Sequence, residues 1–213
     1  MRLLSLSLGL LLLGVVTAWA ETIRMKDKTK IKGQIVRMSD EQVMLAVPRD
    51  SVATVDGKPL PAALKEGAAA PAFSAADLQG TSWQLPRNGL KVTVLHFWVS
   101  WCPHCRHDAP QIQALYDRLH ENSDVQIITV SLDEKREAID RFIQEHHTTY
   151  PVIDSGGEAV ASGKIDLAEI YQVSGFPVTF LIDGKGRIYK KITGSFTESG
   201  LDLEALVDKV PGT

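Results

Sequence analysis

The two cysteines of this 213-residue chain, Cys102 and Cys105, stand two residues apart in the stretch HFWVSWCPHCRHDAP, residues 96–110. A disulfide between them would close a very small loop and restrain little of the unfolded chain, so stability is a poor reason for the pair. Thiols at this spacing can instead exchange disulfides, because one attacks a partner and the other resolves the mixed disulfide. The spacing therefore predicts a redox-active pair.

The position of Cys102 suits a nucleophile. It lies where an apolar strand pattern turns into a helical pattern, and Pro103 fits the first helical position because its missing N–H would have no partner there. The free amides and the positive end of the helix dipole would face the sulfur of Cys102 and favour its thiolate. Cys105 follows about one turn later. We expect Cys102 to attack the partner and Cys105 to resolve the intermediate.

His104 stands between the two cysteines. A protonated imidazole beside Cys102 would stabilise the thiolate further, and a stabilised reduced form makes the disulfide more oxidising. The alternative is a solvent-facing histidine at a variable turn position.

Two metal-related interpretations of the cysteine pair are weaker. A zinc site needs four ligands, and His96 and His107 are the nearest candidates to complete it. Covalent haem attachment needs a histidine immediately after the second cysteine, where this chain has Arg106. Redox chemistry without a metal or other cofactor, through a Cys102–Cys105 disulfide, is the favoured interpretation.

The surrounding pattern predicts an α/β domain with a mixed central sheet flanked by helices. A continuous apolar run over 91–99 is typical of a buried central strand. Strand and helix patterns alternate after it, and Asp183-Gly184-Lys185-Gly186 is a strong hairpin signal between the last two strands. The expected elements are a helix over 103–120, a strand over 125–132, a helix over 134–147, strands over 178–183 and 187–194, and a terminal helix over 197–210.

The first twenty residues have the layout of a secretory signal peptide. One basic residue precedes a Leu-rich core, and Ala18-Trp19-Ala20 provides a small-residue cleavage site. The alternative is an uncleaved membrane anchor. We expect cleavage near Ala20 and a protein that works outside the cytoplasm. The formal net charge of −3 comes without a basic patch, so we expect no nucleic-acid partner.

The mature chain divides by composition into two parts. Short alternating patterns over 21–60 predict a small all-β segment, either an SH3-like barrel or a hairpin platform. A stretch rich in Ala, Pro and Gly over 61–70 predicts a linker, and the α/β domain occupies 67–213.

The motifs FWVSWCPHC and SGFPVTFLID, with a proline five residues after Cys105, resemble the thioredoxin superfamily. GAAAPAFSAADLQGTSWQL and the extra segment over 148–173 are similar to the exported TlpA/ResA-like thiol-disulfide oxidoreductases. The resemblance covers about residues 67–210. It implies a thioredoxin-like fold and an enzyme that exchanges disulfides with protein thiols.

The resemblance also assigns expected roles to residues outside the pair. Pro177 matches the cis-proline that packs beside the disulfide and would leave the Phe176 backbone free to pair with an extended substrate. Trp101 matches the aromatic residue that flanks the site, with simple core packing as the alternative. Asp108 stands where the family usually has glutamate. It could exchange the proton of Cys105, or it is a solvated aspartate near the start of the helix. His96 occupies a strand position where classical thioredoxins have a buried acid. It could act as a proton relay, or it is a packed, hydrogen-bonded core histidine.

The sequence is compatible with either direction of the reaction. Pro103-His104 is the dipeptide of the oxidant DsbA, whereas the whole domain resembles proteins that mostly act as reductants. A dimer formed through the 21–60 segment would favour a disulfide isomerase, and a non-catalytic scaffold is a further alternative. Expected partners are cysteine proteins of the cell envelope, a membrane redox protein and apocytochrome c.

Overall fold

The computed structural model describes residues 64–87 and 89–211, together with the backbone of short strands between residues 21 and 59. The chain divides into two compact units, residues 1–62 and 63–213. The expected signal peptide lies outside the described residues, so cleavage near Ala20 stays a prediction.

The described backbone of the first unit is extended. β2 (Lys30–Met38) pairs antiparallel with β1 (Glu21–Arg24) and β3 (Val43–Ala46). β4 (Thr54–Val55) pairs with β5 (Lys58–Pro59). The connections between these strands lie outside the described residues, so the small β domain over 21–60 stays a prediction. The linker over 61–70 also stays a prediction, although Gly67 and Ala68, within its second half, are hydrogen-bonded to Ile188 of the second unit.

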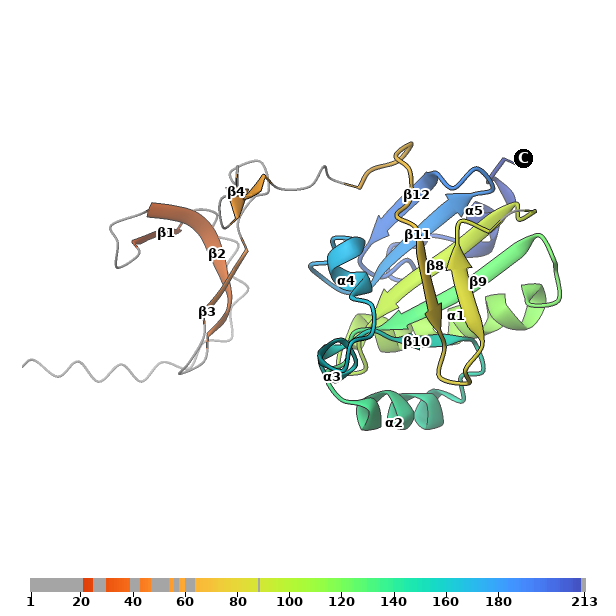
Figure 1. The fold of residues 1–213 in the computed structure, drawn as a ribbon, viewed down its shortest axis with the longest axis horizontal. Coiled ribbons are helices and arrows are strands. Elements are labelled where there is room, and N and C mark those ends of the chain that lie inside the picture. Colours follow the sequence, from red (N-terminus) through yellow and green to blue (C-terminus); the bar gives the residue numbers. More distant parts are fainter. Residues whose placement is uncertain are drawn as a thin grey trace, which may run out of the picture. The chain divides into compact units, whose positions relative to one another are not determined.

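The second unit is built on a five-stranded mixed sheet in the order β10-β9-β8-β11-β12 (Figure 1). β8 (Val92–Trp98), β9 (Val125–Ser131) and β10 (Val152–Asp154) run parallel. β11 (Val178–Asp183) runs antiparallel to β8 and to β12 (Ile188–Thr193). The predicted α/β domain with a mixed sheet and flanking helices is confirmed.

The other elements of this unit are short except for its first helix. They are β6 (Phe73–Ala76), β7 (Ser82–Leu85), α1 (Pro103–Leu119), α2 (Arg136–His146), α3 (Gly157–Ala161), α4 (Leu167–Ile170) and α5 (Leu203–Asp208). In the part of the chain that the structure describes, no helix combines the length and the apolar character needed to span a membrane.

The centre of the sheet is buried on both faces, as the apolar run over 91–99 predicts. All seven residues of β8 are buried. Val94 and Trp98 pack in one cluster with α1 and α5, whereas Leu95 and Phe97 pack in a second cluster with the β6–β7 hairpin and α4. Successive side chains of a strand point to opposite faces, so β8 joins both cores and holds its carboxyl end, where the cysteine motif begins, in a fixed place.

The hairpin between β11 and β12 forms where the sequence predicts it. Asp183 Oδ1 accepts hydrogen bonds from the main-chain N–H groups of Lys185 and Arg187, at 3.0 and 2.9 Å. Gly186 has a φ of 72°, which favours glycine because it has no Cβ. The turn is therefore specified by local chemistry.

The terminal helix is shorter than expected, and the prediction of a helix over 197–210 is wrong at its beginning. α5 starts after Asp202, whose Oδ1 accepts a hydrogen bond from the N–H of Ala205 at 3.1 Å. Gly200 has a φ of 66°, which an α-helix does not accommodate. Thr197–Gly200 instead forms a turn that lies beside α1, with consequences for the site.

Candidate active site

The two thiols are presented by the junction between β8 and α1. Cys102 has an extended backbone at the N-cap of α1, with φ −82° and ψ 119°, and Pro103 follows at the first helical position as predicted. The main-chain carbonyl of Cys102 accepts a hydrogen bond from the N–H of Arg106 at 3.1 Å, and this bond begins the helix. Both cysteines are free thiols, and Cys102 is 6% exposed against 1% for Cys105. A partner therefore reaches Cys102 more easily.

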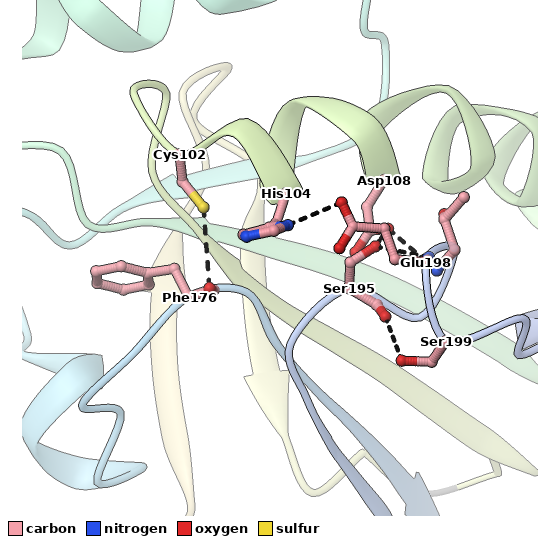
Figure 2. Close-up of polar contacts among 8 residues, drawn as sticks. Cys102, His104, Asp108, Phe176, Ser195, Glu198 and Ser199 are labelled. Carbon is pink, nitrogen blue, oxygen red and sulfur yellow. Dashed lines mark hydrogen bonds and ion pairs between the residues drawn. The ribbon is translucent and has the colours of Figure 1, made fainter. Parts of the chain in front are cut away.

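The Phe176–Pro177 peptide bond is cis, as the resemblance implies, and its loop lies directly beside Cys102. The Sγ of Cys102 is 3.8 Å from the main-chain oxygen of Phe176, across a separation of 74 residues (Figure 2). The sheet explains this contact, because Val178 of β11 pairs with Phe97 of β8. This register brings the cysteine loop after β8 and the Phe176–Pro177 loop before β11 together at the carboxyl end of β8.

Trp101 lies on the surface and not in the core. It is 70% exposed, and its ring makes an edge-to-face contact with Phe176 at a centroid distance of 6.1 Å. The alternative of simple core packing is thereby excluded. An aromatic surface thus borders Cys102 at the side of the Phe176–Pro177 loop.

The Cys105 thiol lies within the core. Burial raises its pKa above the usual range, the neighbouring Cys102 thiol and the Asp108 carboxylate raise it further, and a hydrogen bond with the backbone of Val99 opposes them. The two cysteines therefore differ in burial, which suits different roles in an exchange reaction.

Asp108 is completely buried, so the interpretation as a solvated aspartate is wrong. Its Oδ1 accepts hydrogen bonds from Ser195 Oγ at 2.5 Å and from the N–H of Thr197 at 3.2 Å. Its Oδ2 is buried and has no hydrogen-bond partner among the described residues. The shorter side chain is thus satisfied on one oxygen by the turn that precedes α5.

His96 is buried on the same face of β8 as Trp98, next to the core of α1. Its Nδ1 lies 2.9 Å from Thr179 Oγ1, and its ring contacts Phe196 at a centroid distance of 6.1 Å. Burial lowers the pKa of His96 to about 4, an effect that the nearby Asp108 carboxylate partly opposes. The imidazole is therefore neutral at pH 7.

His104 is half exposed and is paired with Glu198, a residue for which the sequence pattern indicates no role. Nδ1 of His104 lies 2.8 Å from Oε1 of Glu198, and the side chains are 55% and 46% exposed (Figure 2). Ser195 was missed in the same way. The available signal was Gly200 and the capping Asp202, which separate this stretch from the terminal helix.

The zinc interpretation finds no ligand set here. Among the residues that the structure describes, no group of three or more His, Cys, Asp or Glu side chains could hold a metal ion. The polar and reactive groups that lie together at this site are the two thiols, the Phe176 carbonyl and the side chains around α1.

Comparisons with known proteins agree with this arrangement. The model of the Redoxin family matches residues 65–207. Sporulation thiol-disulfide oxidoreductase A of Bacillus subtilis (strain 168) is 33% identical over 141 residues, which are 64% of this chain and 79% of that protein. Thiol-disulfide oxidoreductase ResA of a Bacillus cereus strain is 32% identical over 145 residues, 68% of this chain and 78% of that protein.

Solved structures give the same result. The crystal structure of StoA from Bacillus subtilis has a TM-score of 0.53 at 28% identity, covering 65% of this chain and 95% of that one. The thioredoxin domain of a thiol-disulfide oxidoreductase from Bacteroides vulgatus has a TM-score of 0.53 at 26% identity, covering 66% of this chain and 100% of that one. The expected thioredoxin-like fold is confirmed.

Proposed function

The chain belongs to the Redoxin family as a ResA- and StoA-like thiol-disulfide oxidoreductase, and we propose that it exchanges disulfides with exported proteins through Cys102 and Cys105. The observation that carries this proposal is the contact between the Cys102 thiol and the Phe176 carbonyl at 3.8 Å. This contact supports the proposal because the more accessible thiol lies beside a main-chain group that an extended substrate segment could use.

The reaction balances as an exchange of two electrons. The Cys102 thiolate attacks one sulfur of a substrate disulfide, whose S–S bond breaks and whose other sulfur leaves as a thiolate. The Cys105 thiolate then attacks Cys102 Sγ, forms the Cys102–Cys105 disulfide and releases the second substrate sulfur as a thiolate. The substrate is reduced and the enzyme is oxidised; donation of a disulfide is the reverse sequence. No cofactor other than this cysteine pair is needed.

The substrate would lie along the Phe176–Pro177 loop. Pro177 has no N–H, so the available main-chain groups there belong to Phe176 and its neighbours. Trp101, which is 70% exposed and contacts Phe176, offers an apolar surface for side chains on either side of the substrate cysteine. This surface selects for unfolded or extended cysteine-containing segments more than for one sequence.

Two further residues would handle protons and charge. Burial makes the Cys105 thiolate hard to form, and the buried Oδ2 of Asp108 is available to accept or return its proton. Pro103 sets the start of α1 behind Cys102, and a protonated His104 stabilises the Cys102 thiolate. His96 is buried and neutral, so a packed core histidine fits it better than a relay of charge.

The proposed location is the periplasm or another compartment outside the cytoplasm, reached through the 1–20 signal peptide. Oxidising compartments supply cysteine proteins as substrates. A membrane redox protein would regenerate the active state, and apocytochrome c is a candidate substrate. The 21–60 segment is the candidate dimerisation element, which would suit a disulfide isomerase.

The test compares the full mature chain with Cys102→Ser and Cys105→Ser in reduction of a model protein disulfide. Both variants should lose turnover, and Cys105→Ser alone should accumulate a mixed disulfide with the substrate, seen on a non-reducing gel. Turnover retained by Cys102→Ser would contradict the proposal and favour its weaker alternative, a scaffold whose cysteine pair has no catalytic role.

The direction follows from the reduction potential in glutathione buffers. A value of about −120 mV, as in DsbA, would favour an oxidase, and one of about −270 mV, as in thioredoxin, would favour a reductase.

A further inference from the structure

Glu198 contacts the cysteine motif from a distant part of the chain. It lies in the turn between β12 and α5, 94 residues from His104, and its Oε1 is 2.8 Å from His104 Nδ1. Exposed side chains often form such pairs without consequence. Here hydrogen bonds to α1 fix the turn that carries Glu198, and the ring that it contacts points toward the reactive thiol (Figure 2).

The turn is anchored to α1 by buried hydrogen bonds. Ser195, which is buried, donates from Oγ to Asp108 Oδ1 at 2.5 Å, and the N–H of Thr197 donates to the same oxygen at 3.2 Å. Ser195 Oγ also accepts the N–H of Glu198 at 3.1 Å. The backbone of Glu198 is thus tied to a residue one turn away from His104 on the same helix. The anchored backbone keeps the Glu198 carboxylate within reach of His104.

The pairing determines the proton positions on the ring. An ionised carboxylate only accepts hydrogen bonds, so Nδ1 of His104 carries a proton in both charge states of the imidazole. The second nitrogen, Nε2, is then the site that gains or loses a proton. Figure 2 shows that this end of the ring points toward Cys102 and away from Glu198.

We propose that Cys102, His104 and Glu198 form an acid–base relay for the exchange reaction, with Glu198 as the positioning residue. The inference rests on the proposed function. Nε2 of His104 takes the proton of Cys102 Sγ as the thiolate attacks the substrate disulfide, and the Glu198 carboxylate stabilises the imidazolium that forms. The imidazolium then gives this proton to the substrate thiolate that leaves. Protons and electrons balance, and the relay returns to its starting state.

Other charged groups near His104 are engaged elsewhere or distant in the fold. Arg106 is bound to Glu145 at 2.7 Å and to the carbonyl of Ser100 at 3.3 Å. The remaining ionisable groups on this part of α1 are Cys105, Asp108 and the exposed His107, and the facing cis-proline loop contributes the neutral Phe176 carbonyl. Among the described side chains, Glu198 is the carboxylate that directly contacts the imidazole.

When the Glu198 carboxylate is removed, the relay predicts a shift in the pH midpoint of Cys102 thiolate formation that is opposite in direction to the shift expected from charge repulsion alone. Through-space repulsion from Glu198 disfavours a thiolate at Cys102, so removing the carboxylate would shift the pH midpoint of thiolate formation downward. In the relay, removing it takes stabilisation from the imidazolium, so the midpoint shifts upward. The direction of the shift separates the two cases.

The experiment measures alkylation of Cys102 by iodoacetamide across pH 4–9 in the reduced full mature chain, with the modified residue identified by mass spectrometry. Glu198→Gln should raise the midpoint and slow alkylation near pH 6 by about two- to five-fold, the range of an exposed ion pair. Glu145→Gln is the matched control. It also removes an exposed carboxylate that pairs with a residue of α1, in this case Arg106. It should leave the profile unchanged.

Two outcomes would overturn the proposal: a downward or absent shift in Glu198→Gln, or an equal shift in Glu145→Gln. A second variant pair extends the test, since Glu198→Gln should have no further effect in a His104→Gln background. An undiminished effect there would also contradict the relay. If the unmodified chain fails to reduce a model protein disulfide at every pH, the proposed function fails. A failed relay in an active enzyme leaves that function intact.

Discussion

Ser100 and Asp133 are joined by two hydrogen bonds that connect the cysteine loop to the end of the neighbouring strand. Ser100 Oγ donates to Asp133 Oδ1 at 2.7 Å, and the N–H of Ser100 donates to Oδ2 at 2.8 Å. Ser131 Oγ donates to the same Oδ2 at 2.9 Å. Because Ser100 lies two residues before Cys102, the buried carboxylate fixes the chain at the point where β8 gives way to the reactive thiol.

Replacing Asp133 should therefore destabilise the domain and loosen the site. Asp133→Ala leaves the partly buried donors of Ser100 and the buried hydroxyl of Ser131 unpaired, which should lower the free energy of unfolding by about 1–3 kcal/mol. Urea unfolding measures this loss. Asp140→Ala, which removes an exposed pair with Arg136, is the control and should cost less than about 0.5 kcal/mol. Equal losses in both variants would contradict a special role for Asp133.

Gly156 should tolerate no side chain. A Cβ there would lie 1.6 Å from the main-chain oxygen of Asp133, which cannot move without shifting the same loop. Gly156→Ala should lower the free energy of unfolding by about 3 kcal/mol or more, at the upper end of overpacking effects. Thermal unfolding measures this loss. Gly175→Ala is the control variant, because a Cβ at Gly175 meets nothing within 4 Å. A Gly156→Ala protein as stable as Gly175→Ala would refute this packing.

The second step of exchange should depend steeply on pH. Burial raises the pKa of Cys105, so its thiolate is the minor form near neutrality and its fraction grows about tenfold per pH unit. After attack of Cys102 on an aromatic disulfide, stopped-flow absorbance should show a slower second release of thiol. The rate of that release should rise about tenfold per unit between pH 6 and 8. Cys105→Ser should lack the second release, and a pH-independent rate would contradict direct titration of Cys105 and assign its proton to an internal base such as Asp108.

His96 should make the domain less stable in acid. Burial lowers its pKa in the native state to about 4 from 6.5, so the unfolded chain binds the proton first as the pH falls. The contribution is complete above pH 6.5 and is lost progressively between pH 6.5 and about 4, up to about 3 kcal/mol. Urea unfolding at pH 7, 5.5 and 4.5 measures the slope. His96→Asn should flatten it, and an unchanged slope would assign the acid sensitivity to other groups.

The parts of the fold that depend on local chemistry could be predicted from the sequence. Pro103 marks the start of α1, the Asp183–Gly186 turn marks the hairpin, and the apolar run of β8 marks the centre of the sheet. Resemblance supplied the cis bond before Pro177. Each of these features is encoded in a few adjacent residues or in a known motif.

The environment of α1 could not be predicted in the same way. Asp108 has the same place in the helical pattern whether it meets water or a covering turn, and only the tertiary fold brings Ser195 to it across 87 residues. Glu198 was hidden because its stretch was assigned to the terminal helix. Contacts of this kind depend on where separate elements dock, which a single sequence does not specify.

The position of the Phe176 carbonyl relative to Cys102 depends on the pairing of Val178 with Phe97. A slip of one residue between β11 and β8 would displace the Phe176 carbonyl from Cys102 by about 3.3 Å and turn every side chain of β11 to the opposite face. The length of chain between β10 and β11 does not enter this alignment. The exposed turn at Gly163 is therefore a suitable place to insert an affinity tag or a fluorescent reporter. An insertion there leaves the pairing of β8 with β11 unchanged.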